Sequence, residues 1–129
     1  RIPLSVFFND MQHKEDSVIV GRNDTYKSLE KEGTAGFSYL RFLTKTLKAS
    51  TIDIVLLTIE PENYRDKVTT EAFEYKYIIS GTCDYHIGDH IYTLEAGDSL
   101  FFDGRIKHVP INKAKEPCKM LIIYFFEIK

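Results

Sequence analysis

Short segments of strand length, separated by turn residues, dominate the second half of the chain. These segments are residues 75–80, 82–87, 90–94, 99–102 and 119–126. Several of them alternate apolar and polar residues, and a period of two places alternate side chains on opposite faces of a β-strand. Gly81, Gly88-Asp89 and Asp103-Gly104 stand between segments, where tight turns favour such residues. The pattern predicts antiparallel strands, with a longer turn that passes through His108.

The first half contains two further expected strands and a different opening segment. Residues 37–44 alternate aromatic and aliphatic side chains, and residues 51–59 are rich in β-branched residues. Residues 1–33 are polar and mixed, and residues 25–33 favour a helical turn. With hardly any helix, the chain is predicted to be all-β, with a barrel or sandwich over residues 37–129. We expect residues 1–36 to be a linker or extension that packs on the barrel or on a dimer seam.

Composition and charge narrow the class of protein. Hydrophobic residues make up 43% of the 129 residues, which excludes intrinsic disorder. The formal net charge of −2 argues against DNA contact by this chain, because phosphate binding requires basic surfaces. The two cysteines, Cys83 and Cys118, are expected to be buried thiols in a reducing compartment. No long apolar run or signal peptide is visible, so we expect a cytoplasmic protein without membrane contact.

Seventeen aromatic residues, nine Phe and eight Tyr, supply a rich interior for a small barrel. A barrel of this size is filled by side chains or holds one small ligand. In the first case, rings such as Phe73, Tyr85, Tyr92 and Phe101 fill the core and leave no room for a ligand. In the second case, Tyr85, Tyr92 and Phe101 form walls of a ligand site, and tyrosine hydroxyls offer hydrogen bonds to the ligand.

Two spaced motifs lie within residues 74–112. Glu74 stands seven residues before a glycine that ends a strand, and a later Gly-Asp pair leads through a strand to a His that is followed four residues later by an Asn. The matching residues are Glu74, Gly81, Gly97, Asp98, His108 and Asn112. These motifs resemble the core of the cupin superfamily. The resemblance implies a double-stranded β-helix, a jelly-roll-like antiparallel barrel that extends from about residue 37 to the end of the chain.

The resemblance carries over only in part to the metal site. Catalytic cupins hold a divalent metal through a His-x-His pair, the Glu of the first motif and the His of the second. At the positions of the His-x-His pair this chain has Val68 and Thr70, whereas Glu74 and His108 are present. Two ligands bind a metal weakly, since catalytic sites offer at least three. We therefore expect no metal cofactor, and any metal that did bind would be held by Glu74 and His108.

Lys76 lies two residues after Glu74, where the family usually carries an apolar residue or glycine. Because lysine is rarely buried, the favoured interpretation is that a bulge turns Lys76 outward or that its side chain reaches the barrel mouth. If period two continues instead, Val68, Thr70, Glu74 and Lys76 all face the interior. The Lys76 ammonium would then balance the Glu74 charge in place of a metal, or contact an anionic ligand.

The beginning of the chain suggests a wider context. Residues 2–8, IPLSVFF, followed by a polar tract, resemble the junction after the DNA-binding domain in regulators of the Cro/cI-like (XRE-type) helix-turn-helix family. Ile2, Leu4, Phe7 and Phe8 are expected to pack on the barrel or across a dimer seam. The chain begins with Arg1, so this interpretation places the helix-turn-helix upstream of it. The resemblance implies an effector-sensing domain whose protein contacts DNA through that missing domain.

The predicted function is therefore small-molecule sensing and homodimerisation in a bacterial transcriptional regulator. The effector is unidentified, and the residues predicted to contact it are Glu74, Lys76, His108, Tyr85, Tyr92 and Phe101. Dimers are expected because such regulators read paired half-sites. The alternative is a stand-alone, metal-dependent cupin enzyme of the isomerase or dioxygenase type with a degenerate site. The surviving Glu74 and His108 favour the enzyme, and the two missing His ligands argue against it.

Overall fold

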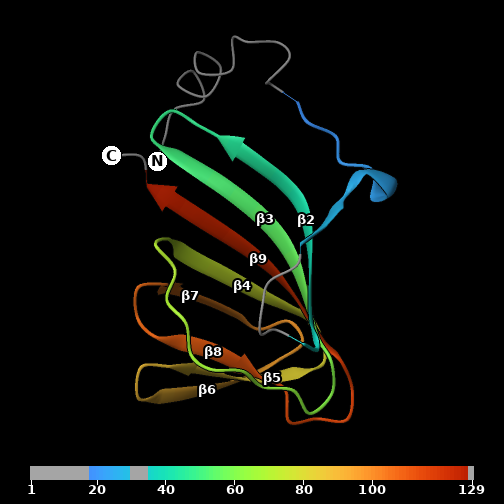
Figure 1. Ribbon diagram of the computed structural model, residues 1–129, viewed down its shortest axis with the longest axis vertical. Coiled ribbons are helices and arrows are strands. Elements are labelled where there is room, and N and C mark those ends of the chain that lie inside the picture. Colours follow the sequence, from blue (N-terminus) through green and yellow to red (C-terminus); the bar gives the residue numbers. More distant parts are fainter. Residues whose placement is uncertain (1–17, 30–34, 128–129) are drawn as a thin grey trace.

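The computed structural model describes residues 18–29 and 35–127 and consists almost entirely of antiparallel strands (Figure 1). The elements are η1 (Asn23–Thr25), β1 (Lys27–Leu29), β2 (Phe37–Thr46), β3 (Ser50–Ile59), β4 (Phe73–Ser80), β5 (Thr82–Ile87), β6 (His90–Glu95), β7 (Ser99–Asp103), β8 (His108–Ile111) and β9 (Cys118–Glu127). Within the described ranges, no helix is long and apolar enough to cross a membrane.

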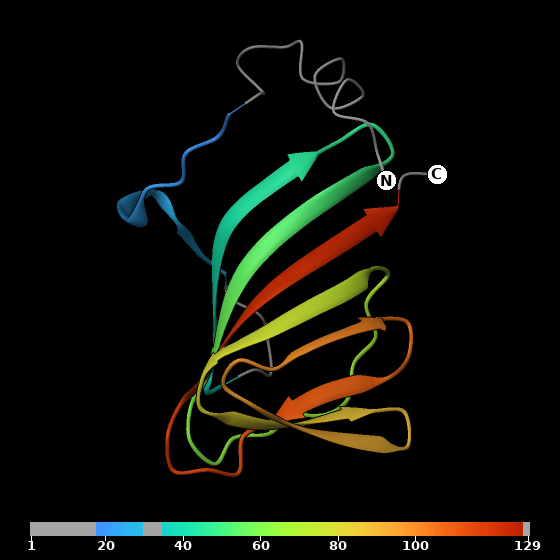
Figure 2. The same cartoon turned by 180° about the vertical axis from the view of Figure 1, so that it is seen from behind.

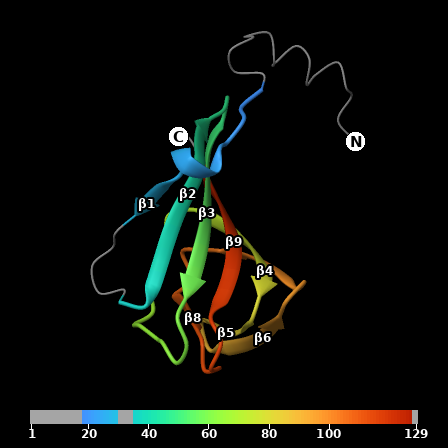
Figure 3. The same ribbon diagram turned by 90° about the vertical axis from the view of Figure 1, so that its right-hand side faces the viewer.

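Two sheets make up the described structure. The large sheet has six strands in the order β1-β2-β3-β9-β4-β7, and the small sheet has three in the order β6-β5-β8. The small sheet lies at the β4–β7 side of the large sheet, while β2, β3 and β9 run beyond it (Figures 1 and 2). Viewed from the side, the two sheets form two layers that meet at one end of the molecule (Figure 3). The all-β prediction is confirmed.

The observed strands match most of the expected ones, with two corrections. His108 begins strand β8 and pairs with Ile87 of β5, so the expected longer turn ends before it. The helical turn predicted for residues 25–33 is wrong over Lys27–Leu29, which pairs with Tyr39–Arg41 as the edge strand β1, and residues 30–33 lie outside the described residues. As an edge strand, this segment forms backbone hydrogen bonds with β2. A helix here would have too few apolar residues on one face to be stabilised by packing. The predicted patch of Ile2, Leu4, Phe7 and Phe8 lies outside the described residues.

The core follows the alternation along each strand. Val55, Leu57 and Ile59 of β3 face inward beside β9, and each of the three is at most 1% exposed. The residues of the core cluster come from both sheets, and they include Ile78, Tyr85, Phe102, Met120 and Ile122. Cys83 and Cys118 are buried, unpaired thiols, as predicted.

Asn112 of the second motif joins two chain segments. Its side-chain nitrogen donates to the carbonyl oxygens of Ile59 (3.0 Å) and Glu116 (2.8 Å), and its side-chain oxygen accepts from the Ala114 backbone N–H (3.0 Å). The side chain is 1% exposed, so these bonds satisfy an amide that would otherwise be costly to bury. Asn112 thus fixes the end of β3 to the loop between β8 and β9.

Two glycines with positive φ allow a prediction that separates backbone strain from steric clash. Gly81 has a φ of 83°, and a Cβ there would lie 2.9 Å from the Cα of Cys118. Gly97 has a φ of 93°, and a Cβ there would meet nothing within 4 Å. Gly97→Ala is expected to lower the free energy of unfolding by about 1–2 kcal/mol, the cost of the left-handed backbone. Gly81→Ala is expected to cost about 1–3 kcal/mol more, because backbone must move.

Urea denaturation of the two variants measures this difference. Equal losses of stability in Gly81→Ala and Gly97→Ala would show that the close approach of the β4–β5 turn to Cys118 carries no energy.

Candidate functional site

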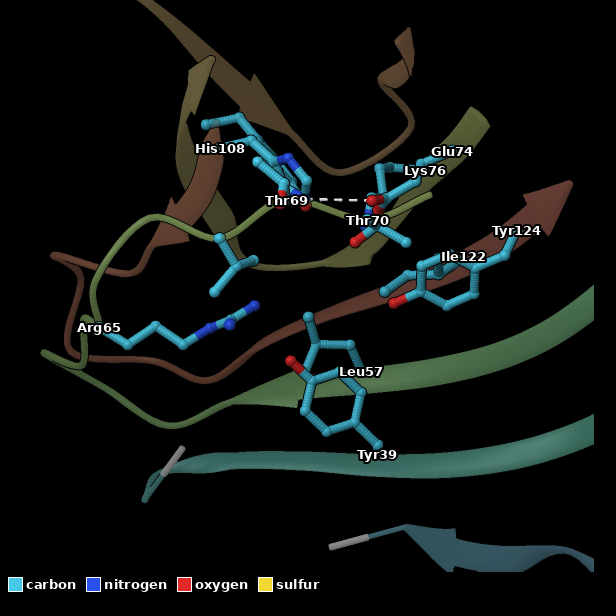
Figure 4. Close-up of a pocket in the computed structure, with 12 residues that line it drawn as sticks. Tyr39, Leu57, Arg65, Thr69, Thr70, Glu74, Lys76, His108, Ile122 and Tyr124 are labelled. Atoms are coloured by element: carbon cyan, nitrogen blue, oxygen red, sulfur yellow. Dashed lines mark ion pairs between the residues drawn. The ribbon is translucent and has the colours of Figure 1, made fainter. Parts of the chain in front are cut away.

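A cavity of about 250 Å³ lies between the sheets (Figure 4). Strands from both sheets and the loop of residues 60–72 line it. The lining residues are Tyr39, Leu57, Arg65, Val68, Thr69, Thr70, Glu74, Lys76, Tyr85, His108, Ile122 and Tyr124. The interior is thus not filled by aromatic side chains, and a small molecule has room to bind.

Backbone hydrogen bonds hold the loop of residues 60–72 beside the cavity. Val68 and His108 exchange two N–H···O bonds of 2.9 Å, and the N–H of Thr70 donates to the carbonyl of Gly104 at 2.8 Å. This pairing places Arg65, Val68 and Thr70 on the cavity wall although they belong to no strand. Val68 and Thr70 thus line the cavity with Glu74, as in the alternative in which period two continues, although they belong to a loop and not to a strand.

Glu74 and Lys76 form a buried ion pair at the centre of the site. The Nζ of Lys76 lies 2.6 Å from the Oε1 of Glu74, and the side chains are 3% and 1% exposed. The favoured interpretation of Lys76 as an outward residue is therefore wrong. Register with β9 is continuous from Glu74 through Lys76, and the irregularity in β4 falls later, between Ile78 and Ser80. Period two is thus maintained, and both side chains face inward.

The surroundings compensate for much of the cost of burying these charges. The Nζ of Lys76 lies 5.4 to 5.8 Å from the ring centres of Tyr85, Phe102 and Tyr124, which attract cations through their electron-rich faces. Burial alone would raise the pKa of Glu74, but attraction to Lys76 and contact with His108 bring it down to about 2. Burial lowers the pKa of Lys76, and Glu74 opposes that shift. The carboxylate is therefore ionised at neutral pH.

His108 contacts the second oxygen of the same carboxylate. Its Nε2 lies 3.1 Å from the Oε2 of Glu74, and its Nδ1 lies 2.7 Å from the carbonyl oxygen of Ile106. Because a carbonyl only accepts, Nδ1 carries a proton. Despite this proximity, Oε2 has no hydrogen-bond partner of good geometry among the described residues. One buried carboxylate oxygen of the site therefore has only the imidazole beside it.

These residues do not fit a divalent metal. Val68 and Thr70 offer no imidazole, and the Lys76 ammonium occupies one oxygen of Glu74. Within residues 18–29 and 35–127, no group of three or more His, Cys, Asp or Glu side chains is arranged to hold a metal ion. A positive charge already neutralises the carboxylate that would bind the metal.

Four of the six predicted contact residues line the cavity, namely Glu74, Lys76, His108 and Tyr85. Tyr92 and Phe101 do not. Phe101 is 59% exposed because it lies between two inward residues of β7 and faces the opposite side of the sheet. Tyr92 shares a face with Tyr85, but it lies on the edge strand β6 and is 43% exposed.

Sequence reasoning missed Arg65, Tyr39 and Tyr124. The two tyrosines occupy inward positions of β2 and β9, so strand alternation could have found them. Burial raises the pKa of Tyr39 and of Tyr124, so both hydroxyls stay protonated. Arg65 lies in a polar loop without periodicity, and no local pattern distinguishes it. Backbone bridges on either side of it, Asn63 with Asn112 and Val68 with His108, hold this part of the loop at the cavity.

Removing one charge of the buried pair is expected to destabilise the protein more than removing both. Lys76→Met leaves Glu74 buried and unpaired, and should lower the free energy of unfolding by about 3–5 kcal/mol. The double variant Glu74→Gln/Lys76→Met leaves no charge and should recover most of that loss.

The Glu74 pKa of about 2 lies below its ordinary 4.5, so stability should fall by about 3 kcal/mol as pH drops from about 4.5 to about 2.

Urea denaturation across that pH range checks both parts, with the double variant as the control that lacks this acid-dependent loss. Additive effects of Glu74→Gln and Lys76→Met would contradict the coupling.

Comparison with known proteins agrees with this architecture. The Cupin_2 family model, a cupin domain, matches residues 55–124, more than half of the chain. The fold is similar to the cupin domain of an XRE family transcriptional regulator from Enterobacter cloacae (19% identity, TM-score 0.64, covering 73% of this chain and 99% of that one). It is also similar to the polyketide cyclase RemF from Streptomyces resistomycificus (12% identity, TM-score 0.70, covering 85% and 80%).

A third similar structure is the hydroxypropylphosphonic acid epoxidase from S. wedmorenis (16% identity, TM-score 0.71, covering 85% of this chain and 60% of that one). The chain thus spans less than two thirds of the epoxidase. No curated protein sequence matches this chain significantly. At these identities the solved structures establish the fold alone. The family match, the two antiparallel sheets and the motif residues at the cavity together show that the chain belongs to the cupin family.

Proposed function

We propose that this cupin domain binds a small molecule without a metal and serves as the effector-sensing part of a bacterial transcriptional regulator. The observation that carries the proposal is the exchange of a metal-ligand set for an ion pair beside a cavity that remains open. Glu74 and Lys76 neutralise each other, and about 250 Å³ remains beside them. A site that only filled space would not keep buried charges next to an empty volume.

The similarity to the cupin domain of an XRE family regulator supports the regulatory context, since this chain covers 99% of that domain. In this proposal the helix-turn-helix lies upstream of Arg1, and it contacts the DNA. The effector acts through a difference in affinity between two arrangements of the protein, because only such a difference shifts an equilibrium.

The second candidate is a metal-dependent enzyme. The retained Glu74 and His108, whose Oε2 and Nε2 lie 3.1 Å apart, are the observation that favours it. The proximity of Lys76 to the carboxylate weakens this alternative, because the ammonium competes with a cation for the same oxygen atoms.

Metal content separates the two candidates. The protein purified without chelator is expected to contain far less than one equivalent of iron, manganese, nickel or zinc. The variant Val68→His/Thr70→His/Lys76→Met restores the missing ligands beside Glu74 and His108, and it should bind a metal tightly. Elemental analysis of both proteins provides the measurement. Near-stoichiometric metal in the natural protein would favour the enzyme.

Ligand binding and genetic context test the other half of the proposal. A small molecule that binds the native state raises the melting temperature, so a thermal-shift screen should find stabilising compounds. The reading frame upstream of Arg1 should encode a helix-turn-helix. A start codon immediately before Arg1 would contradict the regulator but not ligand binding.

A further inference from the structure

The cavity carries a positive charge that nothing in the described structure neutralises. Glu74 and Lys76 balance each other, and Arg65 remains as a further cation on the wall. The Nε of Arg65 is buried and has no hydrogen-bond partner among the described residues. Figure 4 shows its side chain reaching into the cavity from the side opposite Glu74 and Lys76. An unsatisfied buried guanidinium nitrogen is costly, and a bound acceptor would remove that cost.

The two unsatisfied atoms of the cavity are complementary in kind. Arg65 Nε needs an acceptor, whereas Glu74 Oε2 needs a donor. Resting on the proposed function, we infer that the ligand is a small carboxylate that also carries a hydroxyl or amino group. The carboxylate contacts Arg65, for which a planar guanidinium is the preferred partner, and the second group donates to Glu74.

The size of the cavity agrees with such a ligand. Water occupies about 30 Å³ per molecule in the liquid, so the cavity holds roughly eight non-hydrogen atoms. Part of the remaining wall is apolar or aromatic, with Leu57, Ile122 and Tyr85 lining the cavity. A short hydroxy or amino acid with an aliphatic stem therefore matches the volume, the charge and the wall.

Matched compounds test the ligand class. 2-Hydroxybutyrate is expected to raise the melting temperature of the wild type more than butyrate, which lacks the donor, and more than 2-hydroxybutyramide, which lacks the charge. 2-Aminobutyrate tests the amino version of the same ligand. Arg65→Gln should weaken carboxylate binding about tenfold to a hundredfold, as expected for a lost charge-assisted hydrogen bond. Lys67→Gln removes a charge from the same loop outside the cavity and should bind like the wild type.

The outcomes distinguish a wrong ligand class from a wrong function, that is, the carboxylate class from small-molecule binding as such. If neutral compounds stabilise the protein and Arg65→Gln binds them equally well, the small-molecule function stands and the carboxylate class is wrong. If no compound in the broad screen stabilises the wild type, both are wrong. Weakening by Arg65→Gln that Lys67→Gln shares would also overturn the specific role of Arg65.

Discussion

Two opposite charges lie side by side between the sheets, where almost no solvent reaches them. Each would cost several kcal/mol to bury alone, so Glu74 and Lys76 are tolerable only together and only in a rigid arrangement. The pair requires that β4 maintain its alternation through both residues, because a bulge would expel one partner. It also requires the aromatic rings around the ammonium and the imidazole beside the carboxylate. The packing of the cavity wall depends on this constraint.

The same ion pair determines which kind of ligand the cavity can bind. In a metal-binding cupin, a cation bridges side chains from several strands. Here a lysine of the chain supplies the positive charge, and Val68 and Thr70 take the positions of two imidazoles. The space that a metal and its ligands would occupy becomes available to an organic molecule. Arg65, held by the loop that pairs with β8, then gives the cavity its preference for anions.

Local patterns in the sequence were enough to predict most of the strands, the cupin architecture and the incomplete metal site. These follow from local information, namely period two, turn residues and the spacing of Glu74, Gly81 and His108. It also pointed to the shared interior position of Val68, Thr70 and Glu74, although the rarity of buried lysine led to the wrong side for Lys76. Tertiary structure alone decided that side, because the burial of a charge depends on a partner and on the register of neighbouring strands. It likewise decided the exposure of Tyr92 and Phe101, and it brought Arg65 to the cavity through a loop whose position depends on distant backbone pairing.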